Sequence, residues 1–138
     1  RLLILNEATS GLDPVIRDEI LDEFLNFIQD EDHAILISSH ITSDLEKAAD
    51  FVTYLHKGRV AIQGAKDELL ETYGRLACTR SDLERVDPAL LSGRRVGQFG
   101  CEALVKNRRD FCRRYPDLTV DPVNLEDIMV FTVKGDAQ

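Results

Sequence analysis

The sequence lacks several features that would assign it quickly to a class of proteins. It contains no tryptophan, one methionine and three cysteines, and the cysteines show neither a CxxC spacing nor neighbouring histidines. An odd number of isolated cysteines argues against a disulfide framework and favours reduced cytosolic thiols. No apolar run approaches the roughly 20 residues of a membrane-spanning helix, and no leader-like segment opens the chain, so we expect any membrane role to be peripheral.

Basic residues are scarce in the first half of the chain. Residues 1–74 hold 6 Lys and Arg against 15 Asp and Glu, a balance of −9, whereas residues 75–138 hold 11 against 10. Binding to nucleic acid needs clustered cations that neutralise phosphates, so this acidic half argues against a nucleic-acid partner. In the second half the arginines are interleaved with acidic residues, which predicts a solvated surface: Arg94, Arg95, Arg108, Arg109, Arg113 and Arg114.

The chain is organised around one stretch, residues 2–14, which reads LLILNEATSGLDP. Its apolar run is typical of a parallel strand that is buried on both faces. Asn6 and Glu7 follow this run, so they lie at the carboxyl edge of the expected sheet, where open α/β folds bind ligands. Asp13 is suited to cap a helix that begins at Pro14. The alternative is an ordinary strand, loop and capped helix with chance polar residues.

A second strand of the same kind follows after one helix. Residues 14–29 show apolar side chains at helical spacing and acidic residues opposite, which predicts an amphipathic helix docked on a sheet. Ala34–Ile37 is again apolar, and it leads into Ser38, Ser39 and His40. Strand, helix and strand form a crossover unit, and parallel neighbours would bring Glu7 and His40 to the same edge. A histidine alone would more often be structural.

The next residues predict one more helix, a hairpin and a short helix. Ser43–Glu46 matches the S-x-x-E capping box and is expected to open a helix. Lys57–Gly58 separates two strand-like runs, 51–56 and 59–63, as a two-residue hairpin turn does. A helix over about 65–73 is expected to stop at Gly74.

Beyond Gly74 short elements alternate, and they predict a small α+β appendage. The expected strands are 76–79, 95–99, 102–105 and 118–120, and the expected helices are 81–91, 107–115 and one from Leu125.

The strand and turn in residues 2–14 resemble the Walker B strand and D-loop of the ATP-binding cassette (ABC) ATPases. His40 is similar to the H-loop histidine of that family, on the strand after Walker B. The hairpin and following helix also resemble the end of the ABC catalytic domain, so the resemblance covers residues 1–74. Residues 75–138, with their segment Asn124–Met129, more weakly resemble accessory domains that follow the ATPase in some bacterial exporters. The start at Arg1, directly in a strand, is interpreted as a cut.

The resemblance implies a fold and a function. The fold is α/β, part of a P-loop NTPase parallel sheet with flanking helices in residues 1–74, followed by the appendage in residues 75–138. The function is that of the ATP-binding and hydrolysing subunit of an ABC transporter, with ATP and Mg²⁺ as cofactors. A second ABC ATPase domain and a transmembrane permease subunit are the implied partners. The implied location is cytoplasmic, peripheral on the inner face of the cell membrane.

The resemblance also implies roles for single residues. Glu7 is expected to be the general base for the attacking water, and His40 to contact the γ-phosphate. The D-loop residues are expected at the nucleotide and dimer interface: Ser10, Gly11, Leu12 and Asp13. Asn6 stands where the family usually carries the Asp that helps to hold Mg²⁺ through its water shell, and its neutral amide predicts weaker metal binding.

One required motif is missing from these residues. They contain no G-x-x-x-x-G-K-[ST] phosphate loop, so we expect the 138 residues alone not to bind or hydrolyse ATP. Leu91-Ser92-Gly93 resembles the family's LSGGQ signature only superficially, because that signature precedes Walker B, and it is interpreted as chance. Two alternatives stay open: a noncatalytic or degenerate ABC-ATPase interaction module, and an ABC-type ATPase without a transporter.

Overall fold

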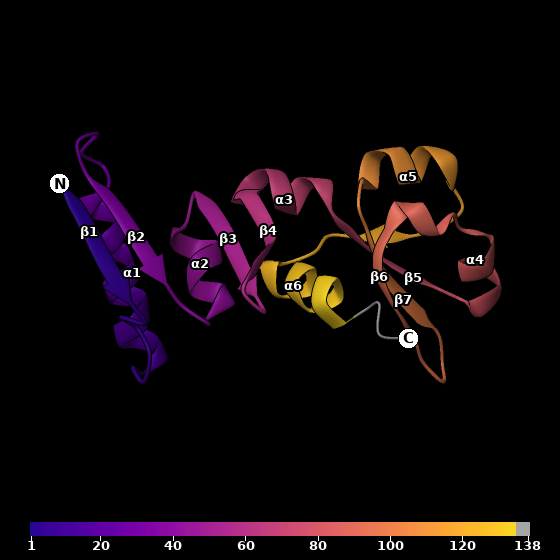
Figure 1. Ribbon diagram of the computed structural model, residues 1–138, viewed down its shortest axis with the longest axis horizontal. Coiled ribbons are helices and arrows are strands. Elements are labelled where there is room, and N and C mark those ends of the chain that lie inside the picture. Colours follow the sequence, from indigo (N-terminus) through magenta and orange to yellow (C-terminus); the bar gives the residue numbers. More distant parts are fainter. Residues whose placement is uncertain (135–138) are drawn as a thin grey trace. The chain divides into compact units, whose positions relative to one another are not determined.

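The computed structural model describes residues 1–134, and the chain divides into two compact units. The first unit is Arg1–Ala49 and the second begins at Asp50. Figure 1 shows the course of the chain through both. In the part of the chain that the structure describes, no helix is long and apolar enough to cross a membrane.

The first unit alternates strands and helices along the chain. Its elements are β1 (Leu2–Asn6), α1 (Pro14–Phe27), β2 (Ala34–Ser38) and α2 (Thr42–Ala48). β1 and β2 are hydrogen-bonded in parallel, with Asn6 opposite Ser38 at their carboxyl ends. The predicted strand, helix and strand crossover is therefore confirmed, and it aligns the ends of the two strands.

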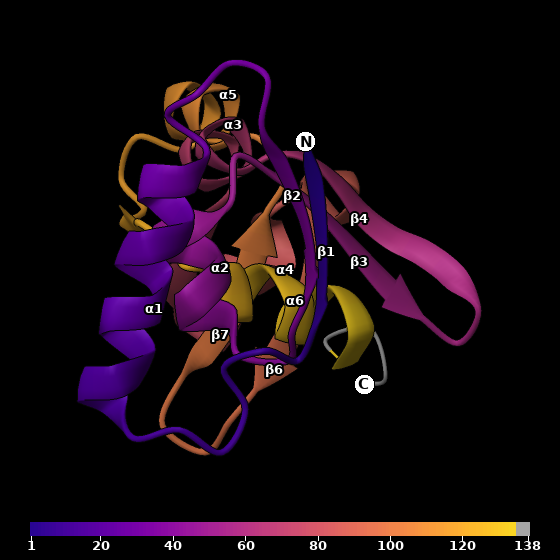
Figure 2. The ribbon, with the colours of Figure 1, turned by 90° about the vertical axis from the view of Figure 1, so that its left-hand side faces the viewer.

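Helix α1 begins as the sequence predicts. The Asp13 side chain accepts hydrogen bonds from the backbone amides of Val15 and Ile16, both at 3.0 Å, and Pro14 occupies the first turn. Leu21 is buried, while other members of the apolar stripe are only partly covered. Figure 2 shows α1 and α2 on the same side of the β1–β2 pair. Both helices of this unit therefore cover the same face of the small sheet.

The other face of the sheet is exposed, so the prediction of burial on both faces is wrong for these residues. Leu2 is 62% exposed, Ile4 67% and Leu36 62%. Side chains of a strand alternate between its two faces, and residues 1–49 supply helices for one face only.

The predicted capping box at the start of α2 is also wrong. The residue before the helix is Ile41, which makes no side-chain cap, so Ser43 lies within the first turn. Ser39 instead accepts a hydrogen bond from the Ile41 amide at 3.0 Å, which turns the chain one step earlier. Local competition by serine for backbone amides explains the shift.

The second unit begins with a hairpin and a short helix. Strands β3 (Phe51–His56) and β4 (Arg59–Ala65) pair antiparallel, and α3 (Lys66–Thr72) follows. Lys57 and Gly58 both have positive φ, 51° and 77°, as a type I′ turn requires. The predicted hairpin is confirmed.

A four-stranded sheet forms the centre of the second unit, in the order β6-β7-β5-β8. The strands are β5 (Gly74–Cys78), β6 (Leu91–Val96), β7 (Cys101–Val105) and β8 (Val120–Asp121). The helices are α4 (Arg80–Arg85), α5 (Arg108–Arg114) and α6 (Leu125–Lys134), with a 3₁₀ turn, η1, at Pro88–Leu90.

This sheet carries an apolar core on each face. On one face Leu76, Ala103 and Phe111, all fully buried, pack with residues of α4 and α5. On the other face Leu104 packs with Ile62 of β4 and with Ile128 and Phe131 of α6. The hairpin therefore shares a core with the later elements.

Four expectations for the second unit need correction. The helix expected over 81–91 ends at Arg85, because Pro88 removes a backbone donor and the chain continues as η1 and then β6. The strand expected over 95–99 is β6, four residues earlier at its start, and the strand expected over 118–120 begins only at Val120. Gly74 is the first residue of β5 and has no positive φ, so it does not act as the predicted helix stop. The domain boundary after residue 74 stays a prediction.

Candidate active site

The turn after β1 places the first candidate residue. The Glu7 amide donates to the Ser38 carbonyl oxygen at 2.8 Å, so the β1–β2 ladder continues to Glu7. Glu7 itself has φ 52°, in the left-handed region that is rare for a residue with a side chain. Such strain is held only where the surroundings determine it, and it turns the chain sharply at the sheet edge.

Glu7 and His40 are in direct contact. His40 Nδ1 lies 2.8 Å from Glu7 Oε2, although the two residues are 33 positions apart. His40 follows β2 by two residues, so the parallel register brings both to one edge. A carboxylate only accepts, so Nδ1 carries a proton and donates, and Nε2 is the ring nitrogen that Glu7 does not engage.

This contact is open to solvent. The His40 side chain is 72% exposed and the Glu7 side chain 38%. Exposed ion pairs contribute only about 0–1 kcal/mol to stability, so the pair is not explained as a means of holding the fold. The arrangement offers a carboxylate and an imidazole side by side on an accessible edge.

Asn6 is the third residue at this edge. Its Oδ1 accepts a hydrogen bond from the Ser38 hydroxyl at 2.5 Å. An amide oxygen has two lone pairs, so Asn6 retains capacity for one further donor, such as a metal-bound water. The possible metal ligands at this edge are the oxygens of the Asn6 amide and the Glu7 carboxylate. Hard oxygen ligands of this kind fit Mg²⁺, although only one of the two is a carboxylate. Among residues 1–134 no group of three or more His, Cys, Asp and Glu side chains could hold a metal.

The four D-loop residues follow directly. Ser10 and Gly11 are exposed and Leu12 is partly buried, while Asp13 is engaged at the start of α1. Gly11 has φ 79°, and a side chain there would be strained even though no atom lies within 4 Å of the Cβ position. The turn therefore needs glycine for its backbone, and its exposed residues are available for contacts.

Comparisons of the sequence with known proteins find transporter ATP-binding proteins. No protein-family model matches the chain. It is 40% identical over 67 residues to the lantibiotic transport ATP-binding protein SrtF of Streptococcus pyogenes, covering 49% of the chain and 29% of that protein. It is 38% identical over 68 residues to the energy-coupling factor transporter ATP-binding protein EcfA2 of Clostridium tetani, covering 49% and 24%. With a putative ABC transporter ATP-binding protein of Mycoplasma pneumoniae it shares 34% over 84 residues, covering 59% and 26%.

About half of the chain is thus similar to a segment of ABC transporter ATP-binding proteins, which supports its interpretation as an ABC ATPase fragment. It spans less than a third of the length of these relatives. The matches named here cover 49% to 59% of this chain.

A buried polar cluster behind the ABC motifs was not predicted from the sequence. Thr9 and Asp44 are 1% and 2% exposed, and the Thr9 hydroxyl donates to Asp44 Oδ2 at 2.6 Å. Arg17 Nε lies 3.1 Å from Asp44 Oδ1. The local S-x-x-E pattern favours Ser43, and not the neighbouring Asp44, as the residue that stabilises the start of this helix.

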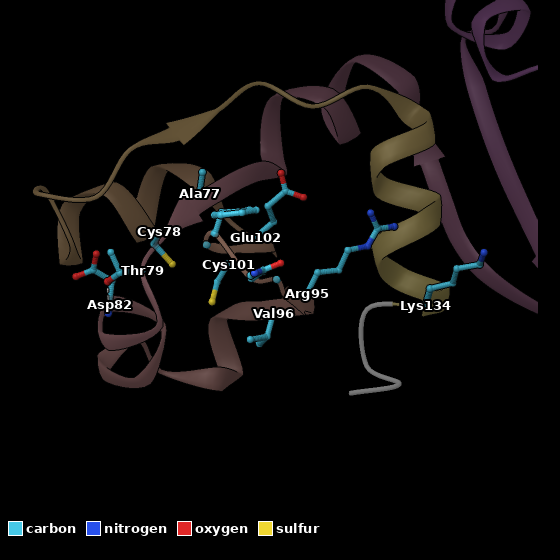
Figure 3. A pocket seen from close by; sticks show the side chains of 13 residues that line it. Ala77, Cys78, Thr79, Asp82, Arg95, Val96, Cys101, Glu102 and Lys134 are labelled. Atoms are coloured by element: carbon cyan, nitrogen blue, oxygen red, sulfur yellow. Dashed lines mark hydrogen bonds between the residues drawn. The ribbon is translucent and has the colours of Figure 1, made fainter.

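The second unit has a hollow of a different character (Figure 3). It lies around the β6–β7 hairpin, and Cys78, Cys101, Arg95 and Glu102 are among the residues that line it. Burial, with smaller contributions from Cys101 and Asp82, raises the pKa of the Cys78 thiol. A raised pKa reduces the thiolate fraction, which makes this thiol a poor nucleophile. The described lining residues include no histidine that could act as a base.

Leu91-Ser92-Gly93 lies at the start of β6, the edge strand of the second sheet. There it pairs with β7, with a shift in register between Leu91 and Gly93.

Proposed function

We propose that this protein belongs to the ATP-hydrolysing subunit of an ABC transporter, which couples ATP hydrolysis to transport. The observation that carries the proposal is the 2.8 Å contact between Glu7 and His40 at the carboxyl edge of two parallel strands. A base and a phosphate-sensing group need a common, accessible edge, and this geometry supplies one. The relatives named above are transporter ATP-binding proteins, which supports the same assignment.

In this proposal Glu7 accepts the proton of the attacking water as general base. The His40 ring, oriented through Nδ1 by Glu7, directs Nε2 outward to the γ-phosphate, and that contact requires Nε2 to carry a proton. The ring would meet this requirement by taking up a proton from solvent at Nε2, while Nδ1–H continues to donate to the Glu7 carboxylate.

Asn6 and Glu7 are the residues that would hold Mg²⁺ with ATP, mostly through bound water. The ion supplies positive charge that offsets the charge on the transferring phosphate. Ser10, Gly11, Leu12 and Asp13 belong at the interface with a second ABC ATPase domain. The remaining partner is a transmembrane permease subunit, so the protein would act at the inner face of the cell membrane.

The fold that we propose is that of a P-loop NTPase sheet. The exposed apolar side chains Leu2, Ile4 and Leu36 support it, because a larger sheet with helices on both faces would bury them. The residues of this chain include no phosphate-binding loop, so we expect them to be inactive without a segment that provides it. Reading the DNA upstream of Arg1 for an in-frame P-loop and signature tests this directly.

One observation favours a second candidate, a noncatalytic ABC-type interaction module. Asn6 replaces a carboxylate with a neutral amide, and its oxygen already accepts from Ser38. A divalent ion is held mainly by charge, so this edge binds it more weakly than an Asp would.

Steady-state ATP hydrolysis by the complete protein decides between the two candidates. We expect Glu7→Gln to lower turnover by about 10² to 10⁴, the usual contribution of a general base, while ATP binding is kept. His40→Ala should also stop turnover, and the double variant should be little worse than either single one, because groups that act as a unit are non-additive.

Glu19→Gln is the matched control, because this carboxylate is exposed and belongs to α1, outside the candidate site residues. It should leave turnover unchanged. Near-normal turnover in Glu7→Gln, or fully multiplicative losses in the double variant, would contradict the assignment of Glu7 and His40. No turnover in the unaltered complete protein would favour the noncatalytic module.

A further inference from the structure

The loop that follows Glu7 and the helix that follows His40 are joined by a buried polar cluster. Thr9, two residues after Glu7, donates its hydroxyl hydrogen to Asp44 Oδ2 at 2.6 Å. Asp44, four residues after His40, lies in the first turn of α2. The cluster therefore joins the two segments that carry the candidate pair.

Both oxygens of the Asp44 carboxylate have partners. Oδ1 lies 3.1 Å from Arg17 Nε, on α1, and Oδ2 accepts from Thr9. The Asp44 side chain is 3% exposed and the Arg17 side chain 28%, so the pair is shielded from water. A buried carboxylate is costly unless it is paired and hydrogen-bonded, and here both conditions are met. Loss of either partner would leave one oxygen of the buried Asp44 carboxylate without its bond.

The cluster fixes three elements against one another. Thr9 belongs to the β1–α1 loop, Arg17 to α1 and Asp44 to α2. Glu7 leaves β1 with a strained backbone, φ 52°, and such a conformation persists only when the surroundings over-determine it. The Ser10 amide bonds the Glu7 carbonyl oxygen at 3.2 Å, so a displaced Thr9 would disturb the turn that carries Glu7.

We propose that Asp44 is a positioning residue, which holds Glu7 and His40 in their hydrogen-bonded contact through Thr9 and Arg17. The proposal rests on the proposed function for its catalytic meaning. Its structural part concerns only residues of the first unit and is testable without ATP.

The chain provides a matched control in Lys47. This side chain also joins α2 to α1, through ion pairs with Asp18 and Asp22, but both carboxylates are more than half exposed. Solvated ion pairs of this kind contribute little to stability. The hydrogen bonds and ion pairs of Lys47 go to Asp18 and Asp22, and none goes to Thr9. Removing Lys47 thus breaks an α1–α2 link without touching the cluster.

The first experiment measures the side-chain nitrogen signals of His40 by NMR in the 138-residue chain, at a pH where the ring is neutral. The unaltered chain should show the Nδ1–H tautomer that Glu7 stabilises. Thr9→Val and Asp44→Asn should both shift His40 toward the Nε2–H tautomer. Lys47→Ala should leave the signals unchanged.

Thr9→Val removes only the hydroxyl hydrogen bond, and Asp44→Asn keeps the shape of the side chain, so backbone spectra can verify that each variant folds. An unchanged Nδ1–H tautomer in a folded Asp44→Asn chain overturns the proposal. Should one variant fail to fold, the other decides in the same way, and Arg17→Gln provides a third test.

The second experiment measures ATP turnover in the complete protein. We expect Asp44→Asn to lower kcat by about 10- to 100-fold, the size of effect that a small misplacement of reacting groups produces, with little change in KM. Asp44→Glu should restore part of the loss. Normal kcat in Asp44→Asn, beside a large loss in Glu7→Gln, overturns the positioning role, whereas normal turnover in Glu7→Gln overturns the proposed function and leaves the tautomer result to stand alone.

Discussion

The two units of the chain differ in what they bury. In residues 1–49 the buried side chains are Leu21, Thr9 and Asp44, of which only the first is apolar. From residue 50 onward, fully buried residues such as Leu76, Leu104 and Phe111 form cores on both faces of a sheet.

The candidate catalytic residues lie in the first unit, where the apolar core is small. The candidate catalytic residues and the larger apolar cores therefore lie in different parts of the chain. An accessible sheet edge serves ligand binding, whereas a filled core serves folding. The predictions below test this separation, starting with the largest expected effect.

Equivalent leucine substitutions in the two units should differ sharply. Leu104→Ala removes a fully buried side chain and should lower the free energy of unfolding by about 2–5 kcal/mol. Leu36→Ala removes one that is 62% exposed, and it should change the free energy by no more than about 0.5 kcal/mol. Urea unfolding of both variants of the 138-residue chain measures the difference.

The same pair sharpens the comparison in the complete protein. If a larger sheet covers β2, Leu36→Ala should there become as costly as Leu104→Ala. A small effect in the complete protein as well would argue against the P-loop sheet that we propose.

Gly74→Ala should destabilise the second unit through crowding. A Cβ at this position would lie 2.4 Å from Val120 Cγ1 and 3.2 Å from two carbons of Arg108. Overpacking of this kind typically costs about 1–3 kcal/mol. Thermal unfolding should show the loss, and the double variant Gly74→Ala with Val120→Ala should recover most of it relative to Val120→Ala alone. A Gly74→Ala chain as stable as the original would mean that β8 moves away freely.

In the complete protein, Asn6→Asp should strengthen the dependence on Mg²⁺ and raise ATP turnover several-fold. The substitution places a second carboxylate beside Glu7, and charge is the main attraction for a hard cation. Magnesium titrations of the hydrolysis rate measure it. Identical titration curves would show that position 6 does not face the ion.

The Cys78 thiol should react slowly with iodoacetamide near neutral pH. Burial raises the pKa of its thiol, so less thiolate is present than for an ordinary cysteine at the same pH. Its alkylation rate should keep rising with pH after the rate of an unperturbed thiol has levelled off. Mass spectrometry of the labelled chain follows Cys78 beside the exposed Cys112. Equal rates at pH 8 would contradict the role of burial.

Much of the first unit was predictable because its signals are local. An apolar run sets a strand, Asp13 and Pro14 set a helix start, and the crossover rule makes the two strands parallel. These local signals are sufficient to predict that Glu7 and His40 lie at the same edge of the sheet, although they do not predict the distance between the two side chains. Lys57–Gly58 likewise determines its own turn through backbone preference.

The errors arose where more than one local pattern competed or where packing decided. Ser43 offered a capping box, but Ser39 turned the chain earlier. Gly74 was predicted to stop a helix, because glycine often does so. The structure gives a different reason for a glycine here: Val120 of β8 approaches the β5 backbone too closely for a side chain. Contacts between residues 46 positions apart leave no local pattern.

The sequence by itself determined which residues are candidates for chemistry, because motif order, strand length and turn residues are written in neighbouring positions. Only the tertiary structure decided that His40 donates to Glu7, that Asp44 is buried between Thr9 and Arg17, and that one face of β1 and β2 is exposed. The physical reason is that hydrogen bonds and burial depend on where distant segments meet, and residue spacing alone does not specify that meeting.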